Sequence, residues 1–304
     1  MIRSATFMSK VLDELVNLLA LERIEENLFR GQSQDLGWGT VFGGQVLGQA
    51  LSAAVQTVPP ERHVHSMQAY FLRRGDVSRP IVYDVDRIRD GASFTTRRVV
   101  AIQGGEAIFN LAASFQKEEP GFEHQDEMPE APPPESIPTD RERLAITADN
   151  LPPAMAASAP RLRERARRES PFEIRTINPI DDPVKPSRKP PTRLAWIRAA
   201  DKLPDQPALH RYLLAYVSDN SFITTSLLPH GVAWLTPSMQ IASLDHVMWF
   251  HRSFRVDEWL LYAMDSPAAH GARGLVRGRI FTRDGHLVAN TAQEGLIRLR
   301  APRP

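Results

Sequence analysis

Hydrophobic residues recur along the chain at two different spacings, and these spacings separate predicted helices from predicted strands. Within residues 11–22, valines and leucines follow one another three or four positions apart, which predicts an amphipathic helix. A second helix is expected from about Gly44 to Gln56, because Pro59 and Pro60 then interrupt the pattern. A third helix is expected to begin near Ala208.

Strand-like segments follow the second helix. Residues 65–72 alternate, with Met67, Ala69 and Phe71 on one face, and residues 80–88 and 93–102 are rich in β-branched and aromatic side chains. Gly104-Gly105 then predicts a tight hairpin turn into a strand over residues 107–115. The same order, a helix and then strands with a glycine turn, returns after the third helix.

The two halves of the chain are also related residue by residue. At a fixed offset of 179, Phe71 coincides with Phe250, Arg73 with Arg252, Val77 with Val256, Tyr83 with Tyr262 and Asp86 with Asp265. After one inserted residue, Gly105 coincides with Gly285 and Ala112 with Ala292. One helix followed by antiparallel strands, used twice, predicts an α+β protein. A double hotdog fits this order, with two tandem repeats that form one continuous core.

Proline usage divides the chain into three parts. Fifteen of the 25 prolines lie between Pro120 and Pro191, where regular structure cannot be continuous. We therefore expect an N-terminal repeat over residues 1–118, a partly ordered connector over 119–192 and a C-terminal repeat over 193–304. The basic stretch 161–168 predicts a helix with a solvated face inside the connector.

Composition and charge exclude several classes of function. The 304 residues include no cysteine, so disulfides, thiolate nucleophiles and cysteine-ligated zinc are excluded. With 37 basic and 36 acidic residues, the net charge of +1 gives no reason to expect nucleic acid as a partner. No apolar run is long enough to predict a membrane span, and no targeting segment is visible, so we expect a cytoplasmic protein.

Common catalytic motifs are missing, and the sequence offers two weaker signals, its histidine pairs and a glycine pair. His246 and His251 point to opposite faces of a predicted strand, and no third ligand accompanies His63 and His65, so we expect no metal site. Gly43-Gly44 opens a predicted helix. The free N–H groups there either hold an anion or a polarised carbonyl, or the glycines only let the helix start close to a strand.

Three polar residues occupy places where apolar ones are expected. Asp219 falls on the apolar stripe of the third helix, so it either faces the core or a cleft, or caps a helix that breaks near residues 218–220. Gln293 shares a strand face with Ala289 and Ile297, which points its amide inward. Ser243 precedes a predicted strand and, taken alone, is typical of a turn.

These residues and their surroundings carry a family resemblance. The matching motifs include Leu28-Phe29-Arg30-Gly31-Gln32-Ser33, Val41-Phe42-Gly43-Gly44-Gln45, Arg89-Asp90-Gly91, Ala113-Ser114-Phe115-Gln116, Tyr216-Val217-Ser218-Asp219, Leu244-Asp245-His246 and Gln293-Glu294-Gly295. Over essentially the whole chain, and most weakly through the connector, the sequence resembles the acyl-CoA thioesterase II family. That family is a double-hotdog group of thioester hydrolases.

The resemblance implies that water, activated by Asp219, Ser243 and Gln293, hydrolyses acyl-CoA to free fatty acid and CoA without a cofactor. The family carries Thr or Ser at the position of Ser243. Surface arginines would have to hold the CoA phosphates, and the candidates are Arg73, Arg74, Arg97 and Arg98. Because hotdog units bury an open face or edge against another copy, we also expect a homodimer or homotetramer.

Two alternative functions remain at this stage. A hotdog enoyl-CoA hydratase would need a His–Asp acid–base pair, but the neighbours Asp245 and His246 point to opposite faces of a strand. A non-catalytic acyl-CoA-binding protein would have no need of an inward-facing carboxylate, so Asp219 argues against it.

Overall fold

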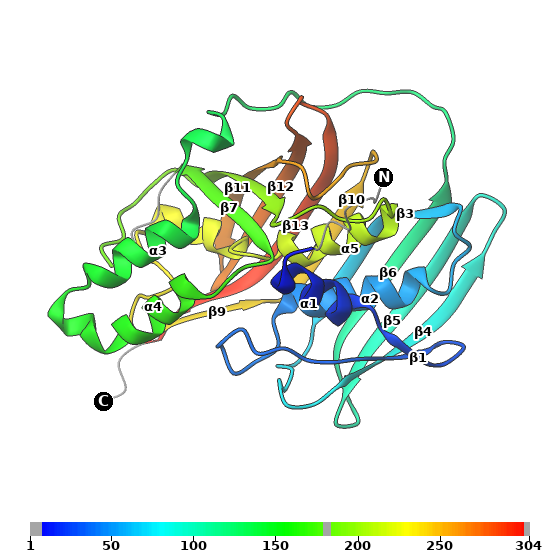
Figure 1. Ribbon diagram of the computed structural model, residues 1–304, viewed down its shortest axis with the longest axis horizontal. Coiled ribbons are helices and arrows are strands. Elements are labelled where there is room, and N and C mark those ends of the chain that lie inside the picture. Colours follow the sequence, from blue (N-terminus) through cyan, green and yellow to red (C-terminus); the bar gives the residue numbers. More distant parts are fainter. Residues whose placement is uncertain (1–7, 179–183, 301–304) are drawn as a thin grey trace, which may run out of the picture.

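A computed structural model describes residues 8–178 and 184–300 and shows a long antiparallel sheet with two helices at its centre (Figure 1). The helices are α1 (Lys10–Leu19), α2 (Gly43–Val55), α3 (Asp140–Asp149), α4 (Ala159–Arg167) and α5 (Pro207–Ser218), with short 3-10 helices η1 (Pro134–Ser136), η2 (Pro153–Ser158) and η3 (Ile223–His230). The first six strands are β1 (Glu22–Glu25), β2 (Leu28–Gly31), β3 (Arg62–Phe71), β4 (Ile81–Asp90), β5 (Phe94–Gln103) and β6 (Glu106–Lys117). The others are β7 (Phe172–Asn178), β8 (Thr192–Ala199), β9 (Met239–Ser243), β10 (Asp245–Phe250), β11 (Leu260–His270), β12 (Arg273–Thr282) and β13 (Leu287–Leu299).

The strand order is the same in both halves of the sheet. Among the described residues it runs β1-β2-β4-β5-β6-β3 and continues β10-β13-β12-β11-β8-β7, with β9 beside β13. Strands β3 and β10 therefore join the two halves, and each strand of the first half has a counterpart in the second, where β9 and β10 together correspond to β3. This is the double hotdog that the repeated sequence predicts.

The pairing of β3 with β10 shows how the repeats are related. Val247 lies opposite Gln68, and these two positions are 179 residues apart, so the pair maps onto itself when the repeats are exchanged. The next pair, Met248 with Met67, maps onto His246 with Ala69 in the same way. A local two-fold axis therefore passes through the centre of the sheet, and the predicted repeat is confirmed.

The inner face of the sheet follows the predicted alternation. On β3, Met67 and Ala69 are buried, whereas the next residue, Tyr70, is 58% exposed. Gly104 and Gly105 form the predicted turn between β5 and β6, and both adopt positive φ angles, which favour glycine in two-residue hairpins.

Helices α2 and α5 pack against each other at the centre (Figure 1). Gly44 lies against the carbonyl oxygen of Tyr216 and Gly48 against that of Tyr212, so the two helices run antiparallel. Most of α2 is buried on all sides. Its buried Gln49 accepts a hydrogen bond from the Tyr83 hydroxyl at 2.7 Å, which satisfies a polar group inside the core.

The proline-rich segment is more ordered than its composition suggests. After β6 it arches across the top of the molecule to the C-terminal half, where the Pro132 carbonyl accepts a hydrogen bond from Trp196 Nε1 (Figure 1). Strand β7 lies inside the predicted connector and pairs with β8 as the counterpart of β1. The second set of strands thus starts at Phe172, although the limits 1–118, 119–192 and 193–304 as domains stay a prediction.

Helix α4 contains most of the predicted basic helix, but it is not simply a solvated surface. Leu162 is buried, and the guanidinium of Arg165 lies 4.2 Å from the ring centroid of Trp38. Basic side chains can therefore cover apolar surface while remaining charged. Among the described residues, no helix is long and apolar enough to cross a membrane.

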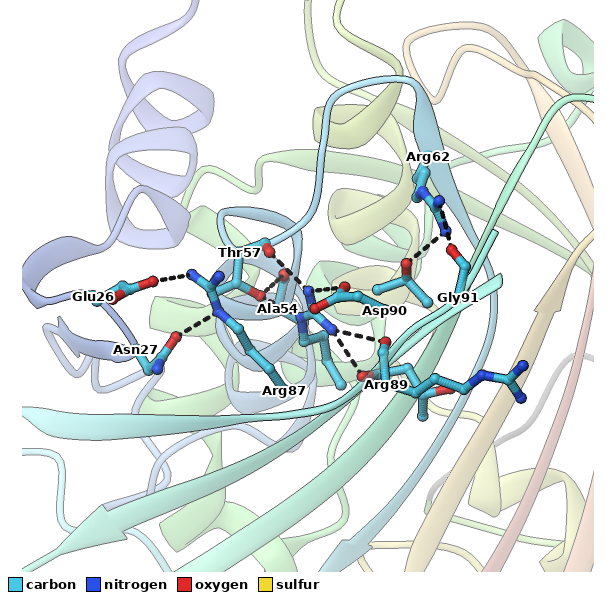
Figure 2. A network of polar contacts seen from close by, with 12 residues as sticks. Glu26, Asn27, Ala54, Thr57, Arg62, Arg87, Arg89, Asp90 and Gly91 are labelled. Atoms are coloured by element: carbon cyan, nitrogen blue, oxygen red, sulfur yellow. Dashed lines mark hydrogen bonds and ion pairs between the residues drawn. The ribbon is translucent and has the colours of Figure 1, made fainter. Parts of the chain in front are cut away.

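One arginine proposed for CoA binding belongs instead to the interior of the N-terminal half. Arg97 is 1% exposed and donates hydrogen bonds to Thr57 Oγ1, to the Thr57 carbonyl and to Asp90 Oδ1, at 2.9, 3.0 and 2.6 Å. Figure 2 shows this network, which ties the strand ends around Asp90 and Gly91 to the end of α2. The candidacy of Arg97 for CoA phosphates was wrong, because its guanidinium is buried and fully engaged; Arg73, Arg74 and Arg98 are exposed.

Candidate active site

The carboxylate of Asp219 lies in the interior at the end of α5. The helix ends at Ser218, so Asp219 is the residue that follows its last turn, and only 9% of it is exposed. The two interpretations of the sequence are therefore compatible, because the backbone ends the helix while the side chain faces the core.

Ser243 and Gln293 both contact this carboxylate. The Ser243 hydroxyl donates to Asp219 Oδ1 at 3.2 Å, and the Gln293 amide nitrogen donates to the same oxygen at 2.8 Å. Gln293 is fully buried on β13, as its strand face predicts. Ser243 is the last residue of β9 and pairs with Gly295, so it ends one strand rather than starting the next. The structure thus brings together all three residues predicted from the sequence.

The start of α2 completes the surroundings of the carboxylate. A Cβ atom on Gly43 would lie 2.6 Å from Asp219 Oδ2, and one on Gly44 would clash with the Tyr216 carbonyl oxygen. The Gly44 N–H also lowers the pKa of Asp219 by hydrogen bonding. The glycine pair therefore serves packing and charge together: Gly44 lets α2 approach the helix α5 rather than only a strand, and the N–H at the helix start faces the Asp219 carboxyl group.

Burial and hydrogen bonding act on Asp219 in opposite directions. Burial raises the pKa of this carboxyl, and hydrogen bonds from Gln293, Ser243 and Gly44 lower it. The net effect is a pKa above the ordinary value of 3.8. Asp219 is therefore a stronger base than a solvent-exposed aspartate, which suits proton transfer.

His246 lies behind this site with its ring in the core. It is fully buried, and its Nε2 is 2.9 Å from Ser218 Oγ. Burial lowers its pKa to about 3, with a smaller opposing effect from Gln293, so the ring is neutral at physiological pH. Asp245 instead accepts a hydrogen bond from the Glu294 N–H on the half-buried opposite side. The two neighbours point away from each other, as predicted.

The sequence pattern did not reveal the partnership between the two halves at this site. Gly43 and Gly44 come from the N-terminal half, and Asp219 from the C-terminal half. The only signal was the glycine pair at a helix start, which has an ordinary packing explanation. Among the described residues, no group of three His, Asp or Glu side chains could hold a metal ion.

A double-hotdog fold with a buried polar cluster between its halves places this protein among the hotdog proteins. Comparison with known proteins shows to which family of hotdog proteins it belongs. Residues 164–296 match the acyl-CoA thioesterase family, and residues 33–116 match the acyl-CoA thioesterase N-terminal domain. The chain is 44% identical over 291 residues to acyl-CoA thioesterase 2 of Haemophilus influenzae, covering 96% of this chain and 99% of that protein.

Solved structures agree with this assignment. An acyl-CoA thioesterase II from Mycobacterium marinum is 40% identical, with a TM-score of 0.76 over 95% of this chain and 100% of that one. A protein with a hotdog fold from Alicyclobacillus acidocaldarius is 20% identical, with a TM-score of 0.71 over 95% of this chain and 99% of its own, which supports the fold alone. The chain belongs to the acyl-CoA thioesterase family, a family of thioester hydrolases.

Proposed function

We propose that this protein hydrolyses acyl-CoA thioesters to free fatty acid and CoA, using a water molecule activated by Asp219. The observation that carries the proposal is the buried Asp219 carboxylate, held at one oxygen by Ser243 and Gln293. Because the Ser243 hydroxyl donates to Asp219, its lone pairs remain available to accept a hydrogen bond from water. Water held between these two groups can give its other proton to Asp219.

The chemistry follows from this arrangement. Water attacks the thioester carbonyl carbon as its proton passes to Asp219, and the carbonyl oxygen becomes an oxyanion. The amide nitrogen of Gln293 has a second hydrogen that can stabilise this oxyanion, which is worth on the order of 10²–10³-fold in rate. The carbon–sulfur bond then breaks, and the proton on Asp219 passes to the departing CoA sulfur. General base catalysis of this kind contributes typically about 10²–10⁴-fold.

Both alternative functions are less well supported. A hydratase would need Asp245 and His246 to act on one substrate, but they face opposite sides of β10 and the His246 pKa is about 3. A binding protein without activity would gain nothing from a buried carboxylate, whose desolvation is costly. Acyl-CoA as the substrate, a homodimer or homotetramer, and a cytoplasmic location belong to the same proposal.

The experiment measures free thiol released from acyl-CoA esters of different chain length. We expect hydrolysis by the wild type and a loss of at least about 10²-fold in kcat for Asp219→Asn. Asp245→Asn is the matched control, and we expect it to keep most of the activity. Thermal melting checks that both variants are folded.

The outcomes separate the function from the site. Absence of thiol release by the wild type at every chain length would exclude a thioesterase, and hydration of enoyl-CoA would then be measured. Full activity of Asp219→Asn would leave the function standing and exclude this mechanism.

A further inference from the structure

A cavity of about 500 Å³ lies where β3 begins and β10 ends, at the end of the β3–β10 pairing opposite Ser243. It is lined by the start of β3, the end of β6, Arg211 of α5 and residues 250–253 after β10. Its volume is within the range of small-molecule sites. Asp219, Ser243 and Gln293 do not line it.

The repeat makes this cavity the counterpart of the proposed active site. With the offset of 179, Val64 in its wall corresponds to Ser243, and Phe250 corresponds to Phe71. Phe71 lies beside Gly43, next to Asp219. With the inserted residue, Ala113 on β6 corresponds to Gln293. The hydroxyl and the amide are therefore replaced by apolar groups, so the arrangement of the proposed active site is not repeated here.

Arg211 gives the cavity a different chemistry. Its side chain lines the cavity, yet the residue is 7% exposed, and its Nε is buried without a hydrogen-bond partner among the described residues. Guanidinium remains charged in proteins. Glu118 supplies an opposite charge nearby, but a buried guanidinium with an unpaired N–H is still costly, so an anion that accepts a hydrogen bond from Arg211 in this cavity would be stabilised.

The neighbouring groups are consistent with an anion. Lys117 and Arg252 also line the cavity, and Glu118 and Glu119 are its acidic members. Burial lowers the pKa of His63 and His65, so these two lining rings offer hydrogen-bonding nitrogens rather than positive charge. The Glu118 carboxylate stands 4.0 Å from His63 Nε2, and its side chain is 77% exposed. It therefore lies at the solvent side, where it acts on Arg211 by its charge but accepts no hydrogen bond from Arg211 Nε.

We propose that this cavity is a second ligand site, in which Arg211 binds the oxyanion of a phosphate- or carboxylate-bearing ligand without hydrolysing it. The phosphates of CoA and the carboxylate of a fatty acid are the two sources of this chemistry. The site does not need Asp219, so it stands apart from the proposed hydrolysis.

Calorimetric titration with inorganic phosphate, CoA and decanoate tests the site. We expect at least one of them to bind, and Arg211→Met to weaken that binding by about tenfold or more, since a charged hydrogen bond is lost. Binding of phosphate and CoA identifies a phosphate site, and binding of decanoate alone identifies a carboxylate site. Arg23→Met is the control, because it removes an exposed positive charge elsewhere.

Two further variants keep the outcome unambiguous. Arg211→Lys retains the charge and should recover part of the affinity, while Asp219→Asn should bind as the wild type does even though it loses turnover. The proposal is overturned if no probe binds at millimolar concentration, or if Arg211→Met binds as tightly as the wild type. It is also overturned if Asp219→Asn removes the binding, because the ligand would then occupy the catalytic site.

Discussion

Gly43 offers a direct test of how closely the two halves must approach at the active site. In Gly43→Ala the added methyl carbon would lie 2.6 Å from Asp219 Oδ2 and 2.9 Å from Phe71 Cε1. Ordinary contact begins at 3.4 Å, so the carboxylate must move by about 0.8 Å. Alanine is otherwise favourable in a helix, so the effect comes from space alone.

The displacement should affect activity more than stability. A misplacement of about 1 Å can cost on the order of 10²-fold in rate, so we expect kcat/KM for acyl-CoA hydrolysis to fall by that amount. The free energy of unfolding should fall by only about 1–2 kcal/mol, because the clashing atoms are the ends of movable side chains. Thiol release and thermal melting measure the two effects separately.

The control variants locate the effect. Gly121→Ala adds a methyl group with no atom within 4 Å and should leave both quantities unchanged. If Gly43 acts through Asp219, adding Gly43→Ala to Asp219→Asn should cost little further activity, since residues that act as a unit are not additive. Activity of Gly43→Ala within twofold of the wild type would refute the argument.

Three further predictions follow from Asp219 and Arg97. Activity should decline on acidification with an apparent pKa above 3.8, because the base must be ionised and its pKa is raised; a kcat profile that stays flat down to that pH would contradict this. Asp219→Asn should increase the free energy of unfolding at neutral pH, because ionisation of the buried carboxyl opposes folding. This gain is absent below pH 3.8 and accumulates as the pH rises through the raised pKa, and urea unfolding at several pH values measures it. Arg97→Met should lower the free energy of unfolding by about 3 kcal/mol, because the end of α2 and Asp90 lose their shared donor, and an unchanged urea midpoint would show that the network in Figure 2 is dispensable.

The parts of the fold that the sequence predicted are those set by local periodicity. Met67 and Ala69 alternate with exposed residues because one face of β3 packs on helices, and the glycine turn of residues 104–105 follows from backbone geometry. Strand β7 escaped prediction, because prolines surround it and its pairing with β8 is a tertiary contact.

The candidate active site could be predicted only in part from the residue pattern. Gln293 could be placed inward from its strand face, whereas the partners of Asp219 came only from the family resemblance, since Ser243 lies 24 residues away and Gln293 lies 74 residues away. The burial of Arg97 could not be foreseen, because an arginine in a strand is usually exposed and one of its hydrogen-bond partners, Thr57, is 40 residues away in the sequence.

The seam between β3 and β10 has a consequence for folding. If the halves separated, both strands would become open sheet edges, with unpaired backbone groups that readily join other chains. The buried faces of α2 and α5 would be exposed at the same moment. We therefore expect neither half to fold independently, because the two halves are arranged like the subunits of a dimer within one polypeptide. Tethering keeps the effective concentration of each partner high, so correct pairing does not depend on the amount of protein in the cell.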